Sequence, residues 1–297
     1  MAKNLPIKNI VSFSGGKDST ALILWAKENL DDFDTVWMDT GWEHPWTYKY
    51  VDYIDQELLD NKLIRLKSSK YDGFEDMSIQ KKRVPSTKAR FCTQKLKLEP
   101  LIDFFDTIRD EYEIHNFVGI RADESFARSK MKETTFDLDY YGCWIQRPLL
   151  KWTAQDVFDI IKRHDIEPNP LYKVGMNRVG CMPCIMNRHS DIRQIIERFP
   201  EVIDRVRRLE EKLNRSFFPP NYIPDAHCSR FQEHEIEVKK IIKDPMFGER
   251  EVVVKKKKTS WYPMIDDVVK YLKNNPDQTE VFESEPQSCM SHYAICE

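Results

Sequence analysis

The sequence lacks a long apolar run and a strong net charge. No stretch approaches the roughly 20 apolar residues that cross a bilayer, and the N-terminal sequence MAKNLPIKNI lacks the apolar core of a signal peptide. The 46 basic and 49 acidic side chains leave a formal net charge of −3, which does not indicate a globally basic nucleic-acid binder. We therefore expect a cytoplasmic protein without a membrane partner, on which local basic patches remain open.

The sequence also lacks an even set of cysteines. It contains seven, and disulfides are rare in the cytoplasm, so a disulfide framework is not indicated. Metal ligation, catalysis or burial must account for the thiols. With 297 residues, 41% of them hydrophobic, the chain can bury a large core and form one large domain or a domain with an appendage.

Apolar strand-like segments alternate with helical ones in the first part of the chain. Helices are predicted over 45–60, 94–109 and 153–164, and strands in NIVSFS, FDTVWMDTGW, KLIRLKS, IHNFVGIRADES and CWIQRPLLKW. This alternation predicts an α/β fold, with a mostly parallel twisted sheet and helices on both faces. Such sheets bind ligands beyond the carboxyl ends of their strands. Polar clusters follow the first, second and fourth predicted strands, which places a candidate site there.

The pattern changes after about residue 190. IRQIIERF and PEVIDRVRRLEEKL predict two helices, and a short helix is predicted near 263–274. The run KKKK indicates a solvated face or a hairpin edge, with a nucleic-acid contact as the alternative. We therefore divide the chain into a first domain, 1–190, and a mainly helical and irregular C-terminal region, 191–297, which ends in a cysteine-containing tail.

The most informative stretch is VSFSGGKDST. It is not a Walker A loop, which needs Ser or Thr directly after Gly-Lys, and the chain has no G-x-G-x-x-G dinucleotide motif. The residue types nevertheless suit a phosphate: Gly15 and Gly16 let backbone amides approach an anion, and Lys17 supplies charge. Ser14 and Ser19 supply hydroxyls, and the helix that follows directs its N-terminal amides at the same point. The alternative is a plain glycine turn.

Taken whole, this motif resembles the PP-loop of the N-type ATP pyrophosphatases. Four later segments resemble motifs of the phosphoadenosine phosphosulfate (PAPS) reductase family: DTGWEHPWTYKYVD, FCTQKLKLEPL, GIRADESFAR and PLLKWTAQDVFDIIKRHDIEPNPLYKVGMNRVGCMPC. The resemblance implies an adenine-nucleotide α-hydrolase-like fold and makes 1–190 a nucleotide-binding domain. It implies that ATP or a related nucleotide binds at these residues: Ser14, Gly15, Gly16, Lys17, Asp18, Ser19, Asp39, Thr40, Gly119, Arg121 and Arg128.

Besides Lys17, four charged residues of this set have candidate roles at the phosphates of a nucleotide. Arg121 and Arg128 can each grip a phosphate through two donors, with a surface salt bridge as the alternative for either. Asp18 and Asp39 are candidates to hold Mg²⁺, which screens the phosphates of ATP.

The PAPS reductase family contains two chemistries. Reductases reduce an activated sulfonucleotide with a thiol and often have a degenerate PP-loop. Other members keep SGGxDS and split ATP into AMP and pyrophosphate, so that sulfur can replace an adenylated oxygen. The intact loop of this chain favours ATP use, and the Glu-Cys-Gly-Leu-His type of reductase segment is missing. The tail SCMSHYAICE leaves a divergent counterpart open.

The resemblance therefore predicts an enzyme, an ATP pyrophosphatase coupled to sulfur transfer, with Lys17, Asp18 and Cys92 as catalytic residues. By analogy the acceptor is nucleic acid, and a cysteine desulfurase or another sulfur donor is the expected partner. Two alternatives stay open: a thiol-dependent sulfonucleotide reductase, and a non-catalytic nucleotide-binding subunit of a sulfur-modification complex.

The C-x-x-C pair, Cys181 and Cys184, suits one metal ion, one cluster or a redox pair. The resemblance adds Cys92 to the candidate ligands, because iron–sulfur members of the family use cysteines at that position together with the C-x-x-C. Those members usually have two adjacent cysteines there, whereas this chain has one. A [4Fe–4S] cluster could be completed by Cys289 or Cys296, or could keep an open iron. A third possibility is a zinc site formed by the C-x-x-C and the two tail cysteines, with Cys92 as sulfur carrier. A fourth is that the cysteines are buried apolar side chains without a ligand.

Two roles are open for each of four further residues. Cys143 is expected in the core, and Cys228 is expected to be a loop thiol, with ligation as the alternative. His44 lies near the nucleotide by motif position, although packing accounts for it equally well. His292 lies between the tail cysteines and is a candidate ligand or base.

Overall fold

The computed structural model describes residues 5–138, 142–244 and 248–276. These residues form two compact units, 5–202 and 203–276, and the boundary lies inside helix α10 (Pro200–Leu213). The functional division that the sequence suggests after residue 190 stays a prediction. None of the described helices combines the length and the apolar character that crossing a bilayer requires.

The first unit is built on a six-stranded sheet with the order β3-β2-β1-β4-β6-β5. Five strands run parallel and β5 runs antiparallel to β6, which confirms the predicted α/β fold with a mostly parallel sheet. Only β5 was not expected. The strands are β1 (Ile7–Phe13), β2 (Asp34–Met38), β3 (Ile64–Leu66), β4 (Glu113–Phe117), β5 (Thr134–Asp137) and β6 (Cys143–Gln146).

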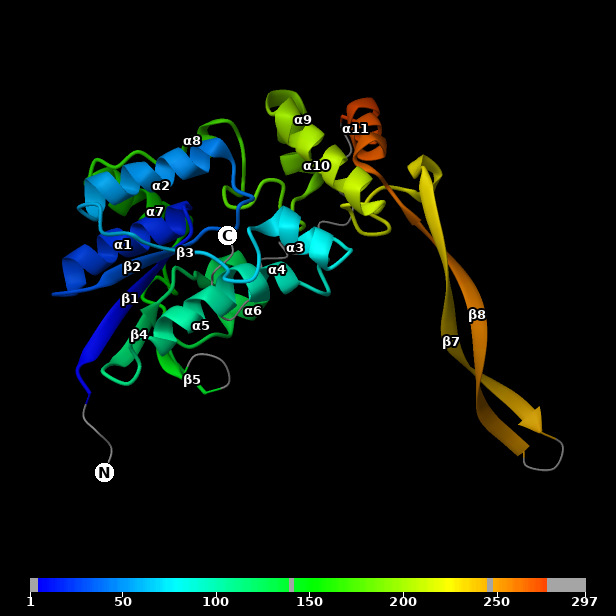
Figure 1. The fold of residues 1–297 in the computed structure, drawn as a ribbon, viewed down its shortest axis with the longest axis horizontal. Helices are drawn as coiled ribbons and strands as arrows, with labels where there is room; N and C mark the ends of the chain where they lie inside the picture. The colour runs from blue at the N-terminus through cyan, green and yellow to red at the C-terminus, as the bar shows by residue number, and fades with distance from the viewer. Residues whose placement is uncertain (1–4, 139–141, 245–247, 277–297) are drawn as a thin grey trace. The chain divides into compact units, whose positions relative to one another are not determined.

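Helices cover both faces of this sheet (Figure 1). Alternate residues of a strand face opposite sides, so Val11 and Phe13 of β1 pack with α1, α2 and α7, whereas Ile10 packs with α5. The helices of this unit are α1 (Lys17–Asn29), α2 (Pro45–Leu58), α3 (Phe74–Gln80), α4 (Phe91–Thr93), α5 (Glu99–Asp106), α6 (Phe126–Ser129), α7 (Ala154–Arg163), α8 (Pro170–Lys173) and α9 (His189–Arg198).

Local signals explain where several helices begin. The Thr153 hydroxyl accepts the Asp156 backbone N–H at 3.2 Å and the Asp156 carboxylate accepts the Thr153 N–H at 2.7 Å, which forms a capping box at the start of α7. The single helix expected over 94–109 is instead divided into a π-helical turn and α5. Pro100 lies in the first turn of α5 and has no N–H to continue the helical ladder, which explains the break.

The sequence led us to expect a mainly helical and irregular C-terminal region over 191–297, but the second unit contains a long pair of strands that was not expected. Beside α10 it contains a 3₁₀ turn (Asp225–His227), helix α11 (Ile265–Asn274) and two 15-residue antiparallel strands, β7 (Arg230–Asp244) and β8 (Gly248–Tyr262). The strands are rich in β-branched residues but also in Lys and Glu, which interrupt the apolar pattern by which strands are recognised.

A buried carboxylate connects the elements of the second unit. Glu210 of α10 is 1% exposed and accepts the backbone N–H of Phe217 at 2.7 Å and that of Ile265, at the start of α11, at 2.8 Å. Burial raises the pKa of Glu210 from its ordinary value of 4.5 to about 7, although both backbone donors act against it.

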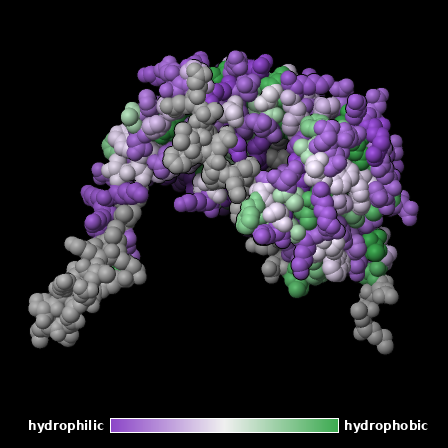
Figure 2. Space-filling view, turned by 180° about the vertical axis from the view of Figure 1, so that it is seen from behind, coloured by the Kyte–Doolittle hydropathy of each residue, from purple (hydrophilic) through white to green (hydrophobic). Residues whose placement is uncertain are grey.

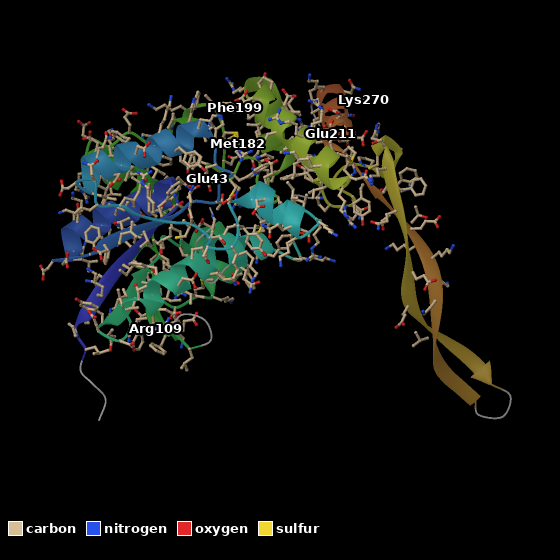
Figure 3. The ribbon with its side chains drawn as sticks, viewed as in Figure 1. Glu43, Arg109, Met182, Phe199, Glu211 and Lys270 are labelled. Atoms are coloured by element: carbon tan, nitrogen blue, oxygen red, sulfur yellow. The ribbon has the colours of Figure 1, made fainter. Side chains whose placement is uncertain are left out.

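The Glu210 contribution to stability is expected to fall as the pH rises. The folded unit holds this proton more tightly than the unfolded chain, so the stabilisation is complete below about pH 4.5 and is lost through about pH 7. The expected loss is about 1–3 kcal/mol. Urea unfolding of wild type and Glu210→Gln between these pH values measures it. Glu211→Gln, at the exposed neighbouring position labelled in Figure 3, is the control. A wild-type pH dependence that Glu210→Gln leaves unchanged would contradict the assignment.

Candidate nucleotide-binding site

Three neighbouring strands carry the predicted site. β2, β1 and β4 are adjacent and parallel, so their carboxyl ends meet at one edge of the sheet. The chain leaves β1 in one direction to β2 and β3 and in the other to β4 and β6, which makes the end of β1 a topological switch point. The segments 14–19, 39–40 and 119–121 follow these three strands directly, as the sequence predicts.

The loop after β1 is closed by its own hydroxyls. Gly15 has a φ of +87°, a conformation that favours glycine. The Ser14 and Ser19 hydroxyls are 2.9 Å apart, and Ser19 also donates to the Gly16 carbonyl at 3.0 Å. From outside the loop, the Asn169 side-chain amide donates to the Gly15 carbonyl at 3.0 Å. The loop therefore holds its turn at the N-terminus of α1 before any ligand arrives.

Asp18 joins two cations beneath this loop. Its carboxylate is fully buried and pairs with Lys17 Nζ at 2.7 Å and with Arg121 Nε. The Arg121 Nη1 also contacts both carboxylate oxygens of Asp123 at 2.6 Å. Burial opposes the charge on Arg121, but Asp18 and Asp123 outweigh it and raise the pKa of the guanidinium. The Arg121 guanidinium is thus held as a cation beside the glycine turn, and the Lys17 ammonium is paired with the same carboxylate.

Gly119 explains how closely two segments of the site approach. A Cβ at this position would lie 3.0 Å from the backbone oxygen of Asp18 and 3.2 Å from the backbone nitrogen of Ser19. The loop after β4 therefore packs directly on the first turn of α1, with no room for a side chain.

Substituting Gly119 with alanine is expected to push these two loops apart. Overpacking of this kind costs about 1–3 kcal/mol, and the displaced first turn of α1 should bind ATP more weakly. Urea unfolding and calorimetric titration with ATP measure the two effects. An unchanged unfolding midpoint together with unchanged ATP affinity would show that the backbone adjusts without cost.

Asp39, at the end of β2, is held by three donors. One oxygen accepts the Tyr48 hydroxyl at 2.8 Å and the Gly41 N–H at 2.9 Å, and the other pairs with Lys67 Nζ at 2.9 Å. Burial acts to raise the pKa of Asp39, but the hydrogen bonds from Lys67, Gly41 and Tyr48 outweigh it and lower the pKa. Asp39 is therefore ionised.

The described carboxylates do not form a free Mg²⁺ site. Both oxygens of Asp18 and both of Asp39 already accept hydrogen bonds or ion pairs from protein groups. A bound ion would need at least one of these partners to move, and exposed Lys67 is the side chain with room to do so. Mg²⁺ binding stays a prediction.

The C-x-x-C segment packs against the loop after β2. Glu43 and Cys181 form an isolated antiparallel bridge, and the Met182 N–H donates to the Trp42 carbonyl at 2.9 Å. The Thr47 hydroxyl donates to the Val179 carbonyl at 2.6 Å. Glu43 and Met182 are labelled in Figure 3, where they lie near each other. The sequence motifs DTGWEH and VGCMPC are thus neighbours in space.

Cys181 is kept as a neutral thiol in this arrangement. Its sulfur lies 3.4 Å from the Thr40 hydroxyl and 3.8 Å from the Glu43 carboxylate. Burial and the Glu43 charge raise the pKa of the Cys181 thiol, and Lys97 opposes them only in part. A thiolate, the form that binds metal or attacks sulfur, is disfavoured here.

The described cysteines do not assemble into the predicted metal site. Among the residues that the structure describes, no three His, Cys, Asp or Glu side chains are placed to hold a metal ion, so Cys92, Cys181 and Cys184 do not fit a cluster or zinc by themselves. Cys92 is half-buried in α4. The proposed tail ligands Cys289 and Cys296, and the candidate His292, lie outside the described residues. The ligand set stays a prediction.

The remaining candidates have structural partners. Arg128 is buried and pairs with Glu124, which lies four residues earlier, before α6 begins. His44 precedes α2 and its Nδ1 accepts the Trp46 N–H at 3.2 Å, which supports the packing alternative. Cys143 lies in the core, where burial raises its pKa to about 12. In the second unit, the Cys228 thiol lies 3.7 Å from the Pro224 carbonyl, and burial raises its pKa.

Four residues that the sequence did not single out support the site. Tyr172 accepts the Lys17 N–H at 3.1 Å, and the Lys17 ammonium lies 5.6 Å from the centroid of its ring. Asn169 fastens the loop, and Glu43 and Tyr48 join the end of β2 to the C-x-x-C segment. The signal for the first pair is the sequence Asn-Pro-Leu-Tyr, which is typical of a short capped helix.

A doubly wound sheet with a glycine–lysine loop at its switch point defines a nucleotide-binding α/β domain. The family model described as the phosphoadenosine phosphosulfate reductase domain matches residues 8–187, and the chain belongs to this family.

The chain is also similar to individual proteins. The chain is 36% identical over 284 residues to an uncharacterized 37.8 kDa protein of Escherichia phage 186, covering 77% of this chain and 83% of that protein. It is 26% identical over 180 residues to the phosphoadenosine 5'-phosphosulfate reductase of Buchnera aphidicola, covering 60% and 70%. The phosphate complex of PAPS reductase from Candida auris aligns with a TM-score of 0.46 at 18% identity, covering 59% and 81%. Because the named relatives are enzymes of sulfonucleotide reduction, membership alone does not decide between the two chemistries.

Proposed function

We propose that the chain is an ATP pyrophosphatase that adenylates an acceptor for sulfur transfer. The observation that carries the proposal is the intact loop from Ser14 to Ser19, beneath which the buried Asp18 holds Lys17 and Arg121. A sulfonucleotide carries sulfate on its α-phosphate, whereas ATP must release pyrophosphate, whose negative charge grows as it leaves. Two fixed cations and a helix N-terminus at one turn suit that leaving group.

In the proposed reaction, an acceptor oxygen attacks the α-phosphorus of ATP. The new P–O bond forms as the bond to the β-phosphate breaks, and pyrophosphate carries the electron pair away. Lys17 and Arg121 stabilise the charge on the departing oxygens, while Asp18 fixes the positions of these two side chains. The outer sulfur of a donor persulfide then attacks the adenylated atom of the acceptor, and AMP leaves with the electron pair. A second thiol attacks the donor-side sulfur of the resulting disulfide, which releases the thiolated acceptor and leaves a new disulfide for an external thiol to reduce.

We propose nucleic acid as the acceptor and a persulfide donor, such as a cysteine desulfurase, as the source of sulfur. Cys92 and the C-x-x-C are the thiols on this chain that could relay the sulfur. Cys181 would first have to lose its proton, for which Lys97 is the nearby favourable charge. No step of the reaction is assigned to a metal ion or cluster.

Product analysis tests the proposal. The full chain is incubated with ATP, with and without nucleic-acid acceptors, and AMP and pyrophosphate are quantified by chromatography. Formation of both in equal amounts is expected. Their absence with every acceptor, although ATP binds tightly, would instead indicate a non-catalytic nucleotide-binding subunit.

The reductase alternative is favoured by one observation, the named relatives in the family. Thioredoxin-dependent release of sulfite from PAPS or adenosine phosphosulfate would establish it. Iron and zinc analysis of anaerobically purified protein tests the cysteine ligands separately. Without either metal at stoichiometric level, the predicted [4Fe–4S] or zinc site is wrong.

A further inference from the structure

The second unit carries a long ribbon of two strands. β7 and β8 pair over their whole length, from Arg230–Tyr262 to Asp244–Gly248, and form a sheet of their own. Fifteen residues at about 3.3 Å each give a ribbon of roughly 50 Å. Figure 1 shows it extending away from α11, the helix that follows it within this unit. The described side chains between positions 231 and 259 are all exposed, so this part of the ribbon does not cover a core.

The lysine run divides between the two faces of the ribbon. Residues 255–258 belong to β8, and all four lysines are exposed. Neighbouring side chains of a strand point to opposite faces. Lys255 and Lys257 stand opposite Glu237 and Glu235, and Lys255 lies 3.6 Å from the Glu235 carboxylate. The charge of this face is therefore balanced.

The other face has no such balance. Lys256 stands opposite position 236, an isoleucine, and Lys258 stands opposite position 234, a histidine. Among the side chains that the structure describes, the even-numbered positions of the two strands hold three basic residues and no acid. They are Arg230, Lys256 and Lys258.

The odd-numbered positions with described side chains hold two lysines and three glutamates. They are Lys255, Lys257, Glu233, Glu235 and Glu237. A chain with an overall charge of −3 thus concentrates positive charge on one face of its ribbon. Local concentration of this kind attracts a polyanion even when the whole protein does not.

We propose that this basic face binds double-stranded DNA, and that duplex DNA is accordingly the acceptor of the proposed reaction. The assignment of the acceptor rests on the proposed function, but DNA binding does not. The major groove of B-DNA is about 12 Å wide and admits a two-stranded ribbon. The major groove of duplex RNA is deep and narrow and does not.

A membrane surface fits these residues less well. An element that binds at a lipid surface inserts an apolar face beside its basic one. Here the face opposite Lys256 and Lys258 is charged, and Figure 2 shows hydrophilic residues (purple) over much of the described part of the ribbon. Anionic vesicles therefore serve as the competing ligand in the test.

The test compares two variants of equal charge. Lys256→Gln/Lys258→Gln removes two charges from the basic face, and Lys255→Gln/Lys257→Gln removes two from the balanced face. Binding of each full-length protein to a fluorescent DNA duplex of about 25 base pairs is measured by anisotropy, without ATP, between about 50 and 200 mM salt. Circular dichroism checks that both variants keep the fold.

The first variant is expected to bind about tenfold more weakly than wild type and to lose about 2 from the slope of log affinity against log salt, since each phosphate contact contributes about 0.9. The second should stay within about twofold of wild type. Equal losses in the two variants, no DNA binding by wild type, or equal or tighter binding to duplex RNA or anionic vesicles would each overturn the proposal. Because no ATP is present, this outcome is independent of whether pyrophosphate is released.

Discussion

Replacing Asp18 with alanine is expected to lower the free energy of unfolding of the first unit by about 3–5 kcal/mol. The Asp18 carboxylate is fully buried, and its removal leaves the buried guanidinium of Arg121 and the ammonium of Lys17 without the charge between them. Loss of one partner from a buried ion pair is costly because the remaining charge stays desolvated. Arg121 keeps Asp123, which limits the cost to the lower part of this range.

Urea unfolding of the first unit, followed by tryptophan fluorescence, measures this loss. Asp32→Ala is the matched control. The Asp32 side chain is 87% exposed, and its carboxylate lies 4.0 Å from Lys8 Nζ, which makes this a weak surface ion pair. Its effect should stay within about 0.5 kcal/mol. Similar midpoints for the two variants would mean that Asp18 does not hold the charges of the site together.

Replacing Lys17 with alanine is expected to reduce kcat/KM for pyrophosphate release by about 100- to 1000-fold. A preorganised donor aimed at developing charge contributes this much in other active sites. The fold should survive, because Asp18 keeps its pair with Arg121, and Lys17 is partly exposed. The two loop variants therefore differ in kind: Asp18→Ala lowers stability and also releases the two cations, whereas Lys17→Ala lowers turnover and leaves the fold intact.

Initial rates of pyrophosphate formation measure the effect of Lys17→Ala. Lys62→Ala removes an exposed lysine beyond the end of α2 and should leave the rate unchanged. If Lys17→Ala retains wild-type kcat/KM while its unfolding midpoint is also unchanged, the loop does not stabilise a leaving pyrophosphate. The proposed function would then lose its main support.

The sheet and most of its helices could be predicted from the sequence because their signals are local. NIVSFS and FDTVWM are apolar runs of strand length, and Thr153 with Asp156 marks the start of a helix in four letters. For the β7–β8 ribbon, the sequence indicated a hairpin edge at KKKK as one interpretation of that run, but neither strand was predicted from its own pattern. Its stability comes from cross-strand pairing between positions such as 237 and 255, and its charged residues disguise the alternation.

The site was predictable where one motif carries it and not where distant segments meet. The loop from Ser14 to Ser19 is contiguous, and its position after β1 follows from the fold. The contacts of Tyr172 with Lys17 and of Cys181 with Glu43 join residues more than 130 positions apart. Nothing in either local sequence shows that Glu43 will raise the pKa of the Cys181 thiol.

These long connections also set the order in which the site can form during synthesis. The loop after β2 is made early, but its partners Val179, Cys181 and Met182 leave the ribosome only after the whole sheet has been translated. Contacts that close such long stretches of chain form late. A nascent chain released before residue 179 would therefore contain all six strands and an unfinished nucleotide site, with the carboxylate of Glu43 uncovered.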